Sequence, residues 1–86
     1  MKESQLKTQL KLLTTNQLKA ICDYLLIADF YPILEDYYLR RIKIFSLEYK
    51  YSMCRNRLVK ILKFCRKKIL QALKDDDFCK RFGNLF

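Results

Sequence analysis

The stretch Lys43–Leu73, KIFSLEYKYSMCRNRLVKILKFCRKKILQAL, carries the most specific structural pattern of the chain. Ile44, Leu47 and Tyr51 recur every three or four residues, which is the spacing of one face of a helix. Ser52–Cys54 then interrupts this period. A second and longer series follows at the same spacing: Leu58, Ile61, Leu62, Cys65 and Ile69. The pattern predicts a short helix, a tight turn and a long helix that begins at Arg55.

The rest of the chain also predicts helices, because apolar residues keep the same spacing and the 86 residues contain one Gly and one Pro. The expected segments are residues 3–13, 16–29 and 32–41 before the motif and a short helix after it. Thr14, Thr15, Asn16 and the Asp75–Asp77 run are residue types that cap helix N-termini. Gly83 is expected to stop the last helix. The fold class predicted is all-α: a single small bundle of about five helices over residues 1–86, with a helix-turn-helix at about 43–73.

Charge is concentrated in this same region. Eleven of the 18 Lys and Arg residues lie between Arg40 and Lys68, where Glu48 is the one acid, so this segment carries a formal charge of +10. The other residues sum to about −1. A cationic segment next to a two-helix motif favours a polyanion as the ligand, because each neutralised phosphate releases counterions. The alternative reading is a solvated charged face.

A DNA-binding helix-turn-helix makes three demands on its sequence: a short bracing helix, a small or apolar residue in the turn, and a second helix that is apolar inward and basic outward. The stretch 43–73 meets each of them. Met53 is the expected plug of the turn, and Cys54 stands where Ser or Thr often caps the second helix.

The stretch Asp36–Leu73 resembles region 4 of bacterial sigma-70-type factors and the small phage and mobile-element regulators related to them. Leu47, Ser52–Cys54 and Leu58 stand where that family has a bracing-helix Ile, a Gly-Val-Ser-type turn and a recognition-helix Val. The chain departs from the family at Glu48, which replaces Ala, and at Ser52, which replaces Gly. A left-handed conformation at Ser52 would therefore be strained.

The resemblance implies that Arg55, Asn56 and Arg57 begin a recognition helix, with Lys60 one turn further on. Arg suits guanine and Asn suits adenine, so these four are the expected base contacts. Seven further cations are the expected phosphate contacts: Arg40, Arg41, Lys43, Lys63, Arg66, Lys67 and Lys68.

The aromatic residues of the basic stretch divide into two groups. Tyr37, Tyr38 and Tyr51 have the spacing of core positions. Tyr49 and Phe64 fall outside the apolar faces and are the expected exposed contacts with a protein partner or with bases.

Several classes of function lack the residues they need. The chain has no His and no Gly-rich phosphate loop, so no enzyme, cofactor or metal site is expected. The four Cys residues are widely spaced and are expected to be reduced thiols, three of them packed as small apolar side chains. No apolar run is long enough for a membrane span, and the first residues are polar, so a cytoplasmic protein is expected.

The sequence therefore favours a sequence-specific double-stranded DNA-binding transcriptional regulator of phage or mobile-element origin, with RNA polymerase or another protein as a second partner. The alternative is a small basic helical inhibitor that acts by binding a protein, such as an anti-defence or polymerase-binding accessory protein. Binding to an anionic membrane surface by helix 55–74 is a third reading, which conflicts with the use of its apolar face in the core.

Overall fold

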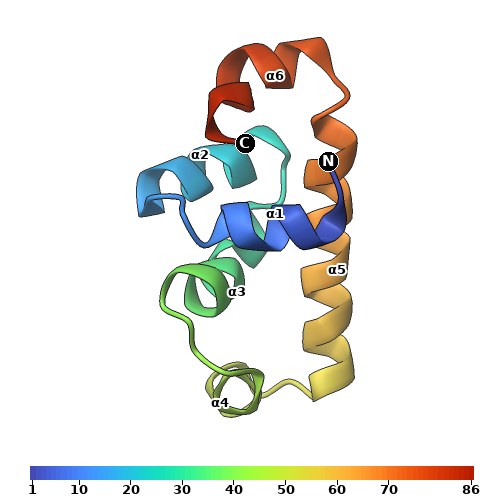
Figure 1. Ribbon diagram of the computed structural model, residues 1–86. Helices are drawn as coiled ribbons and strands as arrows, with labels where there is room; N and C mark the ends of the chain where they lie inside the picture. The colour runs from blue at the N-terminus through green and yellow to red at the C-terminus, as the bar shows by residue number, and fades with distance from the viewer.

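The longest helix, α5 (Arg55–Ala72), forms one edge of the molecule (Figure 1). At 1.5 Å per residue its 18 residues cover about 27 Å, and the molecule is 38 Å long. The computed structural model describes all residues, 1–86, and contains helices and connecting segments without strands. The all-α prediction is confirmed, with six α-helices in place of about five.

The other helices lie on one side of α5. Helix α1 (Glu3–Leu10) crosses it, α4 (Ile44–Tyr51) lies crosswise near its N-terminal end, and α6 (Asp76–Phe82) folds back at its C-terminal end (Figure 1). Helices α2 (Thr15–Tyr24) and α3 (Tyr31–Leu34) complete the body. Every α-helix contributes to one cluster of 16 buried hydrophobic residues, so the six helices share one core.

Two of the predicted helix starts are confirmed by hydrogen bonds. The Thr14 Oγ1 accepts from the Gln17 backbone N–H at 3.2 Å, and the Gln17 side chain accepts from the Thr14 N–H at 2.9 Å. This reciprocal pair is a capping box. The Asp75 side chain accepts from the Asp77 N–H at 3.1 Å and caps α6.

The helix ends before the motif were predicted too late in the chain. Segment 3–13 is helical to Leu10, and segment 16–29 is helical to Tyr24. The second helix ends because Leu26 adopts a left-handed conformation, φ 60°, and the Ile27 N–H closes the turn on the Cys22 carbonyl at 2.9 Å. A 3-10 turn, η1 (Ala28–Phe30), follows.

The predicted helix 32–41 is two segments. After α3 the chain makes a π-helical turn, η2 (Glu35–Leu39), which Arg41 ends with a left-handed φ of 56°. Gly83 was expected to stop the last helix, and α6 does end at Phe82 with Gly83 as its C-cap residue. Its φ is −58°, and the chain continues into the 3-10 turn η3 (Gly83–Leu85).

Candidate nucleic-acid interface

Helices α4 and α5 are joined by the turn Ser52–Cys54, at the positions that the sequence predicts. Leu47 of α4 and Leu58 of α5 are both fully buried, and Met53 packs in part against the core. Ser52 adopts φ 50° and ψ 45°, the left-handed conformation in which a side chain is strained. Cys54 is the N-cap residue of α5, and its side chain makes no capping hydrogen bond.

Asp36 fixes α4 to the body of the protein. Its carboxylate is 4% exposed and accepts from the Lys50 Nζ at 2.7 Å and from the Tyr51 hydroxyl at 2.5 Å. Burial raises the pKa of Asp36, but the hydrogen bonds from Lys50 and Tyr51 outweigh it and leave the pKa below its ordinary value. Burial and the bond to Asp36 raise the pKa of Tyr51 to about 12, so its hydroxyl stays a donor. This ionic anchor lies outside the sequence prediction, which found no role for Asp36.

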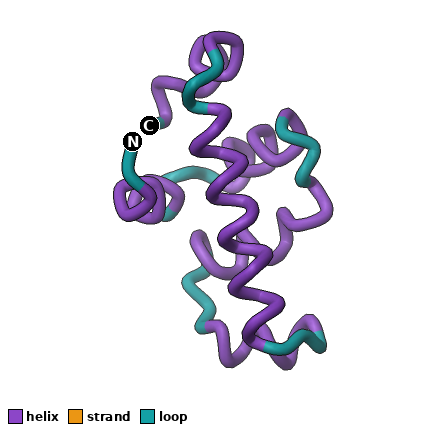
Figure 2. The backbone as a smooth tube through the Cα atoms, turned by 90° about the vertical axis from the view of Figure 1, so that its right-hand side faces the viewer, coloured by secondary structure: helices purple, strands orange, loops and turns teal.

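The outer side of α5 is uncovered. In Figure 2, where this side faces the viewer, α5 runs across the front of the molecule and no other element passes over it. The apolar residues of α5 that are buried, such as Leu58, Leu62 and Ile69, face the body. The helix has no acidic residue, so every charged side chain on its exposed side is cationic.

The predicted base contacts lie at the N-terminal end of this side. Arg55, Asn56, Arg57 and Lys60 are all exposed. Arg55 Nε lies 3.7 Å from Glu48 Oε1, and the two side chains are 61% and 27% exposed, so this ion pair is a weak restraint. Glu48 therefore lies beside the N-terminus of α5. The first turn of α5 presents two guanidinium groups and one amide to solvent.

The predicted phosphate contacts do not all share one surface. Lys63, Lys67 and Lys68 continue the exposed side of α5. Arg41 and Lys43 are exposed in the segment before α4. Arg40 is exposed, but its Nε lies 3.6 Å from the Glu35 carboxylate and 3.8 Å from that of Asp36.

The structure corrects the prediction that Arg66 contacts phosphates. The residue is 7% exposed, and its guanidinium donates to Glu3 Oε1 at 2.8 Å and to the Tyr38 hydroxyl at 2.9 Å. Burial lowers the pKa of Arg66, but these two hydrogen bonds outweigh it and raise the pKa above its ordinary value. The Arg66 hydrogen bond in turn lowers the pKa of Glu3. Arg66 joins α1, η2 and α5 inside the protein, so it is not one of the exposed cations.

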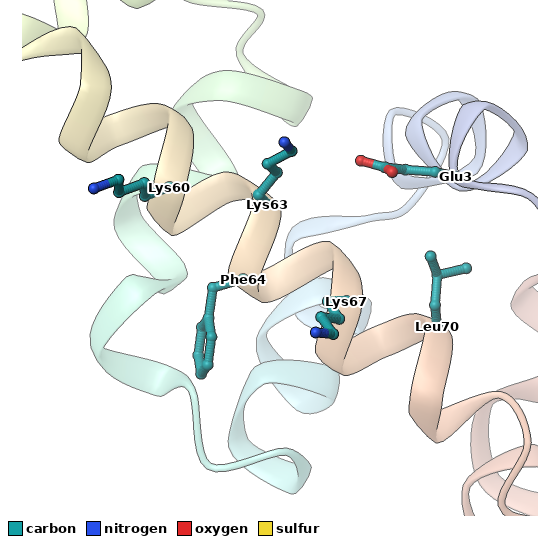
Figure 3. Close-up of a pocket in the computed structure, with 6 residues that line it drawn as sticks. All are labelled: Glu3, Lys60, Lys63, Phe64, Lys67 and Leu70. Atoms are coloured by element: carbon teal, nitrogen blue, oxygen red, sulfur yellow. The ribbon is translucent and has the colours of Figure 1, made fainter.

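A shallow hollow of about 430 Å³ lies on the exposed side of α5. Lys60, Lys63, Phe64, Lys67 and Leu70 line it, with Glu3 of α1 at its border (Figure 3). Figure 3 shows Lys63 and Leu70 directed toward the side on which Glu3 lies, while Phe64 is directed the other way. The hollow combines three ammonium groups with two apolar side chains, which suits an anion that carries an apolar part. Glu3 is the single acid at this surface.

The predicted exposed aromatics are exposed: Tyr49 is 77% and Phe64 46% exposed. Phe64 is held by the edge of the Phe30 ring, with centroids 6.0 Å apart, and by the Lys68 ammonium 5.7 Å from its centroid. Tyr49 pairs edge-on with Phe45, which is 60% exposed, at 5.5 Å. The sequence pattern alone did not single out Phe45, although its spacing of four from Tyr49 marks a shared helix face. Tyr38, by contrast, is buried as predicted.

Cys22 and Cys65 are buried in the core, and burial raises the pKa of these thiols to about 12 and about 11. Cys54 and Cys79 are exposed, so two thiols are packed as apolar residues where three were expected. No group of three or more Cys, Asp or Glu side chains is placed to hold a metal ion. None of the helices is both long enough and apolar enough to cross a bilayer.

Comparisons with protein-family models, with curated proteins and with solved structures find no match to this chain.

Proposed function

We propose that the protein is a sequence-specific double-stranded DNA-binding transcriptional regulator, and that α5 is the helix that enters the major groove. The observation that carries the proposal is the outer side of α5. It is uncovered, it has no acid, and it presents Arg55, Asn56 and Arg57 at its N-terminal end.

The dimensions suit this role. A helix with its side chains is about 10–12 Å across, and the major groove of B-DNA is about 12 Å wide. In helix-turn-helix proteins the N-terminal residues of the second helix contact base edges while the first helix crosses the backbone. Here α4 lies crosswise at the N-terminal end of α5, joined to it by a three-residue turn (Figure 1). The anchor at Asp36 fixes α4 to η2 of the body.

The division of roles along α5 follows from its length. Lys67 is ten residues beyond Arg57, which is about 15 Å along the helix axis. That distance exceeds the width of the groove, so base contacts belong to the first two turns, up to Lys60. Lys63, Lys67 and Lys68 are then proposed to contact the phosphates that border the groove.

The test is a mobility-shift titration with duplex DNA at about 50 mM and about 200 mM salt, after selection of preferred sites from a random duplex library. About six phosphate contacts predict a loss of affinity on the order of 10³-fold between the two salt concentrations. Lys63→Ala and Lys67→Ala should each flatten the salt dependence by about one unit on all sequences. Lys80→Ala on α6 is the control, since it removes the same charge from a helix outside the proposed interface. Absence of binding at low salt would overturn the proposal.

A second candidate function rests on the pair Phe45–Tyr49. These two rings lie exposed on α4, and exposed aromatic side chains are enriched in protein interfaces. They favour a protein-binding role, either beside DNA binding, with RNA polymerase as the partner, or as the sole function of a small helical inhibitor. The origin in a phage or mobile element is likewise part of the proposal and comes from the resemblance of residues 36–73.

A further inference from the structure

A second hollow, of about 310 Å³, lies away from the outer side of α5. It is formed where the end of α1 meets η2 and the segment that leads into α4. Its lining combines cationic and apolar side chains: Lys11, Tyr37, Arg41, Ile42, Lys43 and Ile44. Lys11 comes from a part of the sequence 30 residues before Arg41, so the fold brings these cations together.

The charges of this hollow are unbalanced. Lys11, Arg41 and Lys43 are exposed, none of them forms an ion pair, and no acid lines the hollow. The adjacent Arg40 differs, because Glu35 and Asp36 lie within 4 Å of it. Like charges that converge repel one another, and an anion between them converts that repulsion into attraction. The hollow is therefore arranged for an anionic group that the chain itself does not supply.

The backbone supports the same conclusion. Arg41 occupies the left-handed region, φ 56°, where Gly would be free of strain. The turn is held by the Ile42 N–H, which donates to the Asp36 carbonyl at 2.9 Å. A residue kept in a strained conformation at a solvent-exposed site is a reason to look for a function of its side chain. Here the strained residue is one of the three cations.

The apolar part of the lining narrows the class of anion. Ile42, Ile44 and the Tyr37 ring are partly buried between the cations, and the Tyr37 hydroxyl makes no hydrogen bond within the chain. A phosphodiester backbone offers matching groups, since its phosphates accept from ammonium, guanidinium and hydroxyl donors while its sugars contact apolar side chains.

The path of α1 relates this hollow to α5. The helix begins at Glu3, which is hydrogen-bonded to Arg66 of α5, and it leads to Lys11 at the hollow. Lys43 of the hollow is also the N-cap residue of α4, and in helix-turn-helix proteins this first helix crosses the DNA backbone.

We propose that this hollow is a second contact site for the DNA backbone, in which Lys11, the C-cap residue of α1, acts together with Arg41 and Lys43. The proposal rests on the proposed function, since its ligand is the phosphodiester strand of the duplex that α5 reads. It extends the interface to α1, which the sequence pattern leaves outside the DNA-binding region.

The test compares two lysines that carry the same charge. Lys11→Ala should weaken binding to selected and random duplexes alike and flatten the salt dependence by about one unit, while Lys11→Arg should retain both. Lys19→Ala, an exposed lysine of α2, should change neither. If Lys11→Ala and Lys19→Ala behave alike while the parent protein binds duplex DNA, the second site is refuted and DNA binding by α5 stands. If the parent does not bind duplex DNA, both proposals fail.

A footprint gives a readout that does not depend on net charge. Acetylation of the complete protein, followed by mass spectrometry, should show that duplex DNA protects Lys11 and Lys43 from the reagent, with Lys19 and Lys80 modified as in the free protein. Equal modification of Lys11 with and without bound DNA overturns the proposal even where a variant shows weaker binding.

Discussion

The Tyr51 hydroxyl donates a hydrogen bond to Asp36 Oδ2 at 2.5 Å and ties the last residue of α4 to the π-helical turn 15 residues earlier. The Lys50 ammonium, 2.7 Å from the same oxygen, completes the anchor. Because α4 is short and exposed on one side, these two bonds to one buried carboxylate are what orient it relative to the body. The orientation of α4 in the proposed complex therefore depends on them.

Asp36→Asn should destabilise the protein at neutral pH and reduce the loss of stability that the protein undergoes on acidification. The folded pKa of Asp36 lies below its unfolded value of about 3.9, so the ionised carboxylate stabilises the fold above that pH. This contribution disappears as the pH falls below about 4 and through the lower folded pKa. Thermal melts between pH 2 and pH 7 should show a smaller fall for Asp36→Asn than for the parent. Asp29→Asn, an exposed acid without an ion pair, is the control. Parallel pH profiles for the parent and Asp36→Asn would contradict the anchor.

Arg66→Met should lower stability and leave the salt dependence of DNA binding unchanged. The substitution leaves the buried Tyr38 hydroxyl and the Glu3 carboxylate without their donor, which should cost about 1–3 kcal/mol of the free energy of unfolding. Lys67→Met is the matched variant one residue further on. Its side chain is exposed, so its stability should change by less than about 0.5 kcal/mol and its salt slope should fall by about one unit. Chemical denaturation measures the stability of the two variants, and mobility shifts measure the salt dependence of their DNA binding. A reduced salt slope for folded Arg66→Met would show that Arg66 contacts the DNA.

The burial of Arg66 shows where sequence reasoning reaches its limit. Residue 66 lies between Cys65 and Ile69, beside the apolar face of α5 rather than opposite to it. From the sequence alone, an Arg at that border is interpreted as a solvent-exposed cation unless its hydrogen-bond partners are known. Its partners are Glu3 and Tyr38, 63 and 28 residues away, and no local period connects them.

The register of α5 could be predicted because the same spacing repeats over four turns and a shift of one residue would move every apolar side chain. The ends of the earlier helices could not. Leu26 and Arg41 end their segments in left-handed conformations, φ 60° and φ 56°. That conformation is signalled in a sequence by Gly or Asn, and neither residue stands at these positions. Tertiary contacts impose the two turns, as they impose the meeting of Lys11 with Arg41 and Lys43.

Arg55→Ala combined with Arg57→Ala should abolish sequence preference while the fold is retained. Both side chains are exposed in the first turn of α5 and neither belongs to the core. Each lost base contact should reduce the discrimination between selected and random duplexes by about 1–3 kcal/mol. The measurement is competition between the two duplexes at one salt concentration, with circular dichroism as the control for folding. Discrimination equal to that of the parent would show that another element reads the bases.

Ser52→Gly should stabilise the protein. Ser52 has φ 50° in the turn between α4 and α5, and a side chain there costs about 1–2 kcal/mol that Gly avoids. The greater freedom of Gly in the unfolded chain offsets part of this gain, so a net increase of about 0.5–1 kcal/mol is expected. Ser46→Gly, at an exposed position inside α4, should instead destabilise by about 0.5–1 kcal/mol. Urea melts of the two variants compare them directly, and a loss of stability for both would mean that Ser52 is not left-handed in solution.

Leu58→Ala and Val59→Ala should differ strongly in stability, although they are neighbours. Leu58 is fully buried and packs in the core cluster with Leu47 and Leu62, so truncation should cost about 2–5 kcal/mol. Val59 is 38% exposed, and Ala has the higher helix propensity, so its truncation should change stability by about 0.5 kcal/mol or less. A small domain has on the order of 5–15 kcal/mol in total, so the Leu58 variant can be partly unfolded at room temperature. Urea denaturation followed by circular dichroism measures the free energy of unfolding of both variants. The comparison is made at a low temperature, at which the Leu58 variant is folded. A greater loss of stability for Val59→Ala would mean that α5 is rotated by one residue. Lys60 and Lys67 would then face away from the outer side, and the surface on which the proposed DNA contact depends would be absent.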